Sequence, residues 1–359
     1  MLDFGLHHDH WQLLKAQNLA ARRLWGWGYS IQQQVSAGEP RPRDAGKLLI
    51  ASDFGGEHAG SSHLVYCYLV IRGGFADWSE VIRDARAKFL RDGRTMSYKK
   101  LGDPMRQQAL LSFLTAAANL DGHLVAVAVD KKKKWLSTAP DVAEEFRQSL
   151  GLRANWNPRA FEAMARKVHL AGILISLWAR PYTDVTWITD EDAFVANEVR
   201  HDDALLAAAR FSSFYSPFPM GVYRLNTTGQ DPEFRDYEDL CAIPNLAAGM
   251  LSEISTRLSK VAVWEDRMRR VLDGALPTKT EIIADWFWDV NMPLRKSLIS
   301  IDVEGGRYGV RKIWMVEAPD DTAPGIRLPA ETAEPRALAW EDQHLRLWYI
   351  DAVGGVHMG

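Results

Sequence analysis

Carboxylate side chains stand at the ends of three apolar segments of this sequence, where strands of a sheet are expected to finish. These residues are Asp53, Asp130, Asp190 and Asp192. In an open α/β sheet, ligands bind beyond the carboxyl ends of the strands, so parallel strands would bring the acids together. Mg²⁺ or Mn²⁺ would hold them there, because such a cation takes carboxylate oxygens together with water and phosphate oxygens. A two-metal arrangement would activate water and stabilise the leaving oxygen, which predicts a nuclease.

Within this set, Asp53, Asp190 and Asp192 are the expected catalytic carboxylates. Alternation along a strand would put Asp190 and Asp192 on the same face of the sheet. Asp130 is expected to join them as a metal ligand, although the four lysines 131–134 follow it directly. The competing explanation for each acid is structural, because aspartates cap helices and begin turns, and turns begin where strands end.

Alternating strands and helices are expected to position these acids. Apolar runs predict strands at 47–53, 63–72, 123–130, 184–192 and 220–227, with a short edge strand at 94–102. Helical spacing and capping residues predict helices at 77–91, 104–122, 158–179, 194–211 and 238–273. This pattern predicts an α/β core with a mixed sheet flanked by helices.

Three regions are expected along the 359 residues. Residues 1–46 are predicted to form an N-terminal helical arm and linker, and residues 47–273 the α/β core. Residues 274–359 contain aromatic clusters and Gly- and Pro-rich connections, which predict a smaller β-rich appendage packed on the core. Two cysteines, Cys67 and Cys241, lie in apolar runs and are expected to be buried free thiols.

The composition is that of an ordinary globular protein, with 47% hydrophobic and 25% charged residues. No apolar run reaches the length of about 20 residues that a bilayer span requires, and the first residues do not resemble a secretory signal, so a cytoplasmic protein without a membrane partner is expected. The net charge of −3 gives no global attraction to nucleic acid. Lys99 and Lys100 are therefore the candidate contacts to substrate phosphates, with solvated loop lysines as the alternative.

Several motifs carry a family resemblance over about residues 47–255. These are LLIASDFGG, MSYKKLGDPMRQQALLSFL, HLVAVAVDKK, VTWITDED and DLCAIPNLAAGML. Their succession resembles an uncharacterised branch of the ribonuclease H-like superfamily, whose members open with a strand bearing Asp-Glu-Ser-Gly and finish with a helix of the type Leu-Ala-Asp-Leu-x-Ala-Gly. The resemblance implies a ribonuclease H-like mixed sheet and a divalent-metal-dependent nuclease.

The sequence departs from that pattern at two places. Phe54, Gly55 and Gly56 replace Glu-Ser-Gly after the first aspartate, and Asn245 stands where the final helix would carry an aspartate. Asparagine can ligate a metal through its carbonyl oxygen but brings no charge, so Asn245 is expected to be a weaker ligand. The alternative function is a noncatalytic nucleic-acid-binding or protein-interaction subunit on the same fold. Whether the nucleic acid is DNA or RNA, and whether the chain self-associates, is left open.

Overall fold

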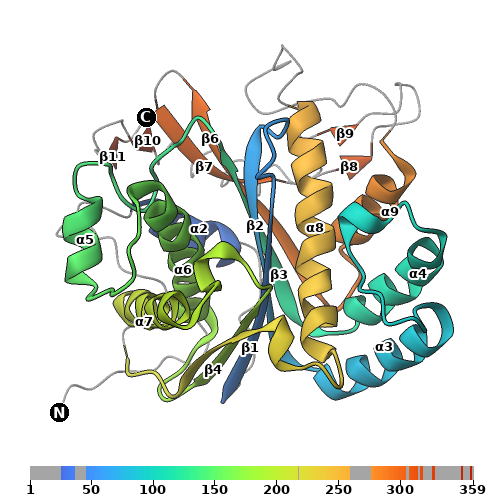
Figure 1. The fold of residues 1–359 in the computed structure, drawn as a ribbon. Coiled ribbons are helices and arrows are strands. Elements are labelled where there is room, and N and C mark those ends of the chain that lie inside the picture. The colour runs from blue at the N-terminus through green and yellow to red at the C-terminus, as the bar shows by residue number, and fades with distance from the viewer. Residues whose placement is uncertain are drawn as a thin grey trace.

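A mixed sheet lies between two layers of helices in the computed structural model of this chain (Figure 1). The described residues are 26–36, 46–216, 218–258, 276–304, 307–313, 316–317, 326–327, 349–350 and 356–357. The predicted α/β class and mixed sheet are confirmed. The sheet follows the order β11-β10-β7-β6-β3-β2-β1-β4-β5.

The strands of this sheet include the five that the apolar runs predicted. They are β1 (Lys47–Gly55), β2 (His63–Gly73), β3 (Asp121–Asp130), β4 (Asp184–Thr189), β5 (Tyr223–Thr227), β6 (Arg295–Glu304), β7 (Arg307–Ile313), β10 (Tyr349–Ile350) and β11 (Val356–His357). The short strands β8 (Val316–Glu317) and β9 (Ile326–Arg327) pair with each other. Strand β1 is parallel to β4 and antiparallel to β2, and β4 is parallel to β5. The carboxyl ends of β1, β4 and β5 therefore lie at one edge of the sheet.

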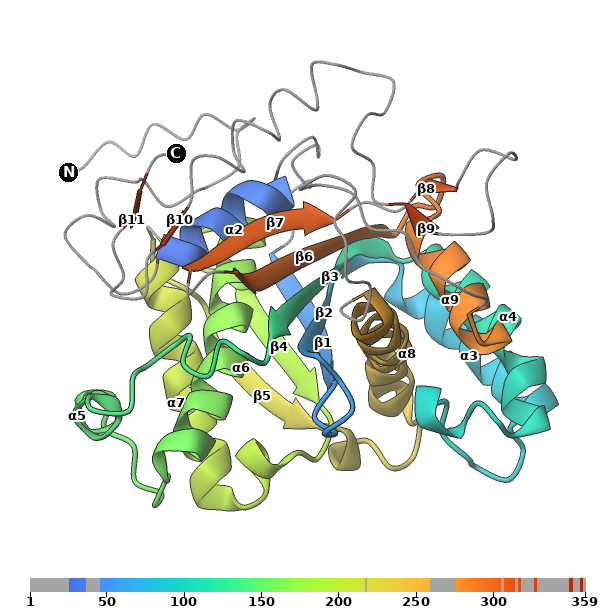
Figure 2. The ribbon, with the colours of Figure 1, turned by 90° about the horizontal axis from the view of Figure 1, so that it is seen from above.

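Helices cover both faces of the sheet (Figure 2). They are α2 (Gly26–Ser36), α3 (Phe75–Phe89), α4 (Pro104–Ala118), α5 (Ala143–Ser149), α6 (Pro158–Trp178), α7 (Glu198–Tyr215), α8 (Asp236–Leu258) and α9 (Thr278–Trp288). Helices α2, α6 and α7 contribute to one apolar core cluster, and α3, α4, α8 and α9 contribute to the other. The sheet separates these two clusters.

Alternation along β1 decides which cluster each of its side chains joins. Leu48 and Ile50 pack in the cluster that contains α6, whereas Ala51 packs in the cluster that contains α8. Because successive side chains point to opposite faces, Asp53 continues the series of Ala51 on the α8 face. Phe54 packs against the cluster on the α6 face.

The prediction of an edge strand at 94–102 is wrong. This segment is a loop with a single 3₁₀ turn, η1 (Tyr98–Lys100), and it lies against α8. The backbone N–H of Tyr98 donates to the side chain of Asn245 instead of to a neighbouring strand. A tertiary contact to a helix has therefore replaced the sheet pairing that the local sequence suggested.

The predicted strand at 184–192 ends early, because β4 finishes at Thr189. The predicted helix at 238–273 begins at Asp236 and is described as far as Leu258, and residues 259–275 lie outside the described part of the chain. Helices α5 and α9 were not expected.

The sheet and its core extend beyond the predicted boundaries at residues 46 and 273. Trp27, Ile31 and Val35 of α2 are fully buried in the cluster that also contains β1 and α6. Strand β6 pairs with β3 in parallel, so it continues the central sheet. The described parts of the arm and the appendage thus share the core of residues 47–273, because their apolar faces find burial only there.

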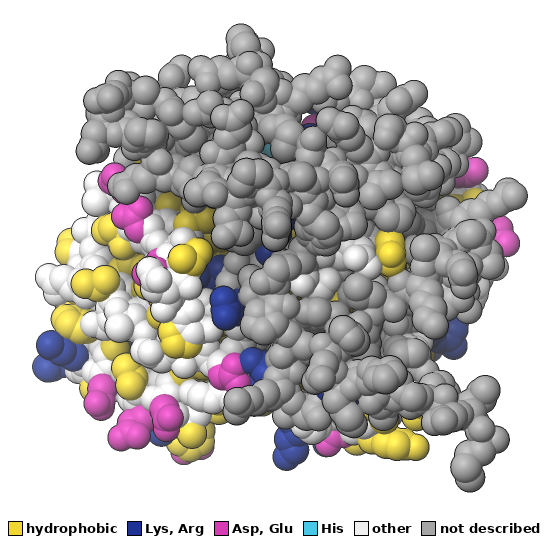
Figure 3. Space-filling view, turned by 180° about the vertical axis from the view of Figure 1, so that it is seen from behind, with side chains coloured by type: hydrophobic (Ala, Val, Ile, Leu, Met, Phe, Trp, Pro, Cys, Tyr) yellow, Lys and Arg dark blue, Asp and Glu magenta, His cyan; other side chains and the backbone are white. Residues whose placement is uncertain are grey.

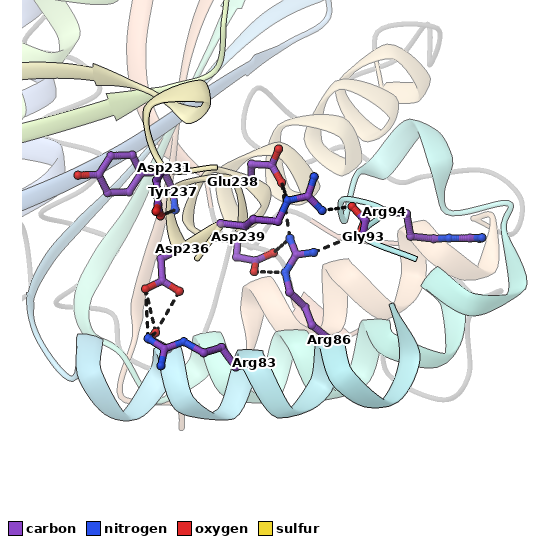
Figure 4. A network of polar contacts seen from close by, with 11 residues as sticks. Arg83, Arg86, Gly93, Arg94, Asp231, Asp236, Tyr237, Glu238 and Asp239 are labelled. Atoms are coloured by element: carbon purple, nitrogen blue, oxygen red, sulfur yellow. Dashed lines mark hydrogen bonds and ion pairs between the residues drawn. The ribbon is translucent and has the colours of Figure 1, made fainter. Parts of the chain in front are cut away.

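Ion pairs fix the beginning of α8 against α3 (Figure 4). Arg86 Nη2 donates to Asp239 Oδ1 at 2.6 Å, and Arg86 Nη1 donates to the carbonyl oxygen of Arg94 at 3.3 Å. Arg83 lies 3.5 Å from the carboxylate of Asp236. These contacts also hold the start of the loop that leads to Tyr98.

No helix within the described residues combines the length and the apolar character that crossing a membrane requires. On the face opposite to that of Figure 1, the visible described Lys and Arg side chains are interspersed with Asp and Glu (Figure 3). The net charge of −3 gives no global attraction to a polyanion.

Candidate functional site

Asp53 lies at the carboxyl end of β1 and faces α8. Its Oδ2 atom accepts a hydrogen bond from Asn245 Nδ2 at 2.7 Å, and its Oδ1 atom accepts one from the backbone N–H of Phe54. Burial raises the pKa of Asp53 to about 6 against the lowering effect of these hydrogen bonds, and the charges of Asp190 and Asp192 raise it further. Asp53 is therefore a carboxylate whose negative charge is only partly compensated.

Asp190 is the nearest counterpart of Asp53 on the neighbouring strand. The last registered pair between β1 and β4 is Ser52 with Thr189, so Asp53 and Asp190 occupy the next position on each chain. Asp190 is exposed, and its Oδ1 atom accepts from Thr228 Oγ1 at 3.0 Å. The structure thus places two of the predicted carboxylates at the carboxyl ends of neighbouring parallel strands, with Asp190 one residue beyond the end of β4.

Asp192 is turned toward α6 instead. Its carboxylate pairs with the ammonium group of Lys167, and its other oxygen accepts from the backbone N–H of Ala193 at the start of η2 (Ala193–Val195). The expectation that Asp190 and Asp192 share a strand face is wrong, because β4 ends at Thr189 and the alternation ends with it. Asp192 still lies near enough to raise the pKa of Asp53.

Lys167 is a charged residue at this edge that the sequence did not single out. It is buried on α6, with its Nζ atom 4.4 Å from the ring centroid of Phe54 and 5.1 Å from that of Phe194. The carboxylate of Glu57 lies 3.8 Å from Nζ. The only sequence signal was a lysine within a helix that is otherwise apolar along much of its length, which favours a buried partner.

Asn245 presents its amide nitrogen to Asp53 and its amide oxygen to Tyr98. Oδ1 accepts the backbone N–H of Tyr98 at 2.8 Å. Asn245 therefore faces Asp53, but the oxygen that would ligate a cation is turned to the loop. Asp239 and Glu253, the nearest acid on each side of it in the sequence, have other partners: Asp239 pairs with Arg86, and Glu253 accepts from the Tyr98 hydroxyl.

Asp130 lies apart from this group. Cys67 of β2 pairs with both Asp53 and Ala126, so Asp130 is four residues farther along β3, which is about 13 Å at the rise of a strand. Its Oδ1 atom accepts from the backbone N–H of Lys132 at 2.9 Å. The structure places Asp130 in a turn at the end of β3, as the structural explanation of strand-end aspartates expects.

Lys99 and Lys100 are exposed in η1, directly after Tyr98. The contact between Tyr98 and Asn245 places their backbone beside α8. Of the lysines that follow Asp130, Lys131 donates to the carbonyl oxygen of His58 at 2.6 Å, and Lys133 lies 4.2 Å from the ring centroid of Tyr308. Of these lysines, Lys99 and Lys100 are the two that directly follow a residue in contact with Asn245.

A divalent cation at Asp53 would find few protein ligands among the described residues. Among the described residues, no three His, Cys, Asp or Glu side chains form a group that could hold a metal ion. Mg²⁺ nevertheless takes only one or two carboxylates when water and phosphate supply the other oxygens. Asp53 and Asp190 meet that requirement.

Comparison with models of protein families gave no match, and comparison with curated proteins gave none either.

Cys67 and Cys241 are buried free thiols, which confirms that prediction.

Proposed function

We propose that this protein is a divalent-metal-dependent nuclease with a ribonuclease H-like core, in which Asp53 and Asp190 hold Mg²⁺ or Mn²⁺. The observation that carries the proposal is the partly compensated carboxylate of Asp53, with its pKa of about 6, beside Asp190 at the ends of two parallel strands. Like charges so placed repel, and a cation between them removes the repulsion.

The fold supports the core assignment. Strands β1 to β5 follow the spatial order 3-2-1-4-5, and only β2 runs against the other four. This is the arrangement expected of a ribonuclease H-like sheet, with the first aspartate on the central strand and the last helix packed beside it. The contact between Asp53 and Asn245 joins the first and last motifs of the resemblance.

Each residue of the site would have its own role in phosphodiester hydrolysis. Asp53 and Asp190 bind the cation, Asn245 orients Asp53, and the exposed Lys99 and Lys100 bind phosphates of a DNA or RNA strand. When bound, the cation supplies a water of lowered pKa and stabilises charge on the phosphate oxygens. Asp192 contributes negative potential at the same edge, and its own charge is paired with Lys167.

A noncatalytic nucleic-acid-binding or interaction subunit is the second candidate. It is favoured by the partners of two expected ligands, because Lys167 already neutralises Asp192 and Asn245 offers Asp53 an amide nitrogen. Such a subunit would retain Lys99 and Lys100 for phosphates or present its surface to a protein partner. Cleavage of nucleic acid separates the two candidates.

Cleavage of labelled single- and double-stranded DNA and RNA in Mg²⁺ or Mn²⁺ tests the proposal. Asp53→Asn should abolish metal-dependent cleavage, since it removes one of the two charged ligands. Asp130→Asn is the matched control, because it makes the same change at a strand end outside the site. Equal activity of Asp53→Asn and wild type would eliminate the role of Asp53. Binding without cleavage in any divalent ion would select the second candidate.

A further inference from the structure

The side-chain amide of Asn245 joins segments that are far apart in the sequence. Its nitrogen donates to Asp53 on β1 at 2.7 Å, and its oxygen accepts from the backbone N–H of Tyr98, between α3 and α4, at 2.8 Å. Asn245 itself is half-buried in the middle of α8. The planar amide of Asn245 therefore contacts both the carboxylate of Asp53 and the loop at Tyr98.

The two contacts also fix which way the amide is turned. Rotating the amide by half a turn would place its oxygen against the carboxylate of Asp53 and its NH₂ group against the N–H of Tyr98. Both contacts would then be repulsive. An aspartate at position 245 would keep an acceptor for Tyr98 and lose the donor to Asp53, whereas a leucine would lose both.

The loop that Asn245 holds is also fixed through the side chain of Tyr98. The hydroxyl of Tyr98 donates to Glu253 Oε2 at 2.5 Å, and its ring packs so closely on Gly249 that a Cβ atom there would lie 2.2 Å from Cγ. The next two residues are Lys99 and Lys100, both exposed. Since consecutive Cα atoms are about 3.8 Å apart, both lysines begin within about 8 Å of Tyr98.

We propose that Asn245 is the positioning residue of the site, orienting the Asp53 carboxylate with its nitrogen and docking the backbone of Lys99 and Lys100 with its oxygen. The proposal rests on the function proposed above. The amide of Asn245 would thus have a positioning role at the place where the proteins that the sequence resembles carry an aspartate. A nucleic-acid phosphate bound by the two lysines is thereby held in a fixed relation to the carboxylate that would bind the cation.

Hydrogen exchange at the Tyr98 amide and an NMR titration of the Asp53 carboxyl test the two contacts separately. Asn245→Leu should speed exchange of the Tyr98 N–H by about tenfold or more, because its acceptor is removed. Asn245→Asp should leave that exchange within about twofold of wild type, because a carboxylate oxygen still accepts. Both variants should move the midpoint of the Asp53 titration to higher pH, since each removes a donor to the charged form.

Binding of a fluorescent single-stranded oligonucleotide in Mg²⁺ measures the consequence for substrate. Asn245→Leu should raise Kd by about tenfold, as should the double variant Lys99→Gln/Lys100→Gln. Combining all three changes should weaken binding little further, because the lysines act through the backbone that Asn245 holds.

The matched control is Asn157→Asp, at the start of α6. Asn157 caps that helix by accepting the backbone N–H of Ala160 at 2.9 Å, and an aspartate caps a helix equally well. This variant adds the same charge and should leave exchange at Tyr98, the Asp53 titration and oligonucleotide binding unchanged.

Unchanged exchange at Tyr98 in a folded Asn245→Leu protein would overturn the positioning role, and so would an unmoved Asp53 midpoint in both variants. Full additivity of the Asn245 and lysine changes would overturn the link to substrate. If the wild type binds no oligonucleotide in Mg²⁺ or Mn²⁺, the proposed function fails, and the exchange and titration results then decide the positioning role alone.

Discussion

At the ends of β1 and β4, the carboxylates on the two faces of the sheet have different partners. On the α6 face, Asp192 meets the buried ammonium group of Lys167, which also lies over the rings of Phe54 and Phe194. On the α8 face, Asp53 meets the neutral amide of Asn245, and its pKa rises to about 6 chiefly because of burial. On the α6 face the carboxylate is paired with a cationic side chain, whereas on the α8 face it accepts a hydrogen bond from a neutral one.

The two faces would therefore respond differently to an added divalent cation. A buried lysine beside an acid already satisfies the charge, so an added divalent cation there would meet an ammonium group. An amide stabilises a carboxylate by one hydrogen bond and adds no charge of its own.

The largest effect is expected from breaking the charge pair on the α6 face. Asp192→Asn should destabilise the protein by about 3 kcal/mol, because it leaves the ammonium group of Lys167 buried without its closest anion. Lys167→Met should destabilise less, since the side chain of Asp192 is 25% exposed and can be hydrated. Urea unfolding at neutral pH measures both.

The double variant Lys167→Met/Asp192→Asn serves as the internal control for this pair. It should recover much of the loss, because neither charge is then left unpaired. A loss in the double variant equal to the sum of the single losses would mean that the two charges are not coupled.

The next effect comes from removing the partly compensated charge on the α8 face. The folded-state pKa of Asp53, about 6, lies above its ordinary value of 3.8, so the folded state holds the proton more tightly. The resulting stabilisation is present at low pH and is lost as pH rises through about 6. Asp53→Asn lacks this loss, so its stability relative to wild type should improve by about 1 to 2 kcal/mol between about pH 4 and about pH 8.

Urea unfolding of both proteins across that pH range, with chelator present, measures the difference. A constant offset between them at every pH would contradict the raised pKa. Adding Mg²⁺ should stabilise the wild type at the upper end of the range and leave Asp53→Asn little changed, if the cation binds there.

A smaller effect is expected when an acid is restored at position 245. In chelator, Asn245→Asp should lower the melting temperature, corresponding to about 1 kcal/mol, because a carboxylate then faces Asp53. In Mg²⁺ the change should have the opposite sign, since a third carboxylate joins the cation. Differential scanning fluorimetry under both conditions measures this. The same shift with and without Mg²⁺ would place any cation away from residue 245.

The smallest effect on stability is expected at the exposed lysines. Lys99→Gln and Lys100→Gln should each change the unfolding free energy by less than about 0.5 kcal/mol, because both side chains are solvated. If they contact phosphates, the double variant should reduce the dependence of log Kd on log salt by about two. An unchanged salt dependence would remove their role in binding.

Local patterns in the sequence determined most of the secondary structure of the core. The apolar runs 48–51 and 64–71 are uninterrupted, as is typical of strands buried on both faces, and β1 and β2 formed as expected. Asp103, followed by Pro104, marked the start of α4 because capping is a local interaction. Asp53 was likewise recognisable from the local sequence, as an acid where an apolar run ends.

Only the tertiary structure decided which charges and amides meet at the site. Asp53 and Asn245 are 192 residues apart, and Lys167 meets Asp192 because α6 packs on the same sheet face as the turn after β4. The loop at 94–102 lies against α8, where Asn245 accepts the backbone N–H of Tyr98. Such contacts depend on the burial of whole helix and sheet faces, which no short stretch of sequence encodes, and so the compensation of each carboxylate appears only once the chain is folded.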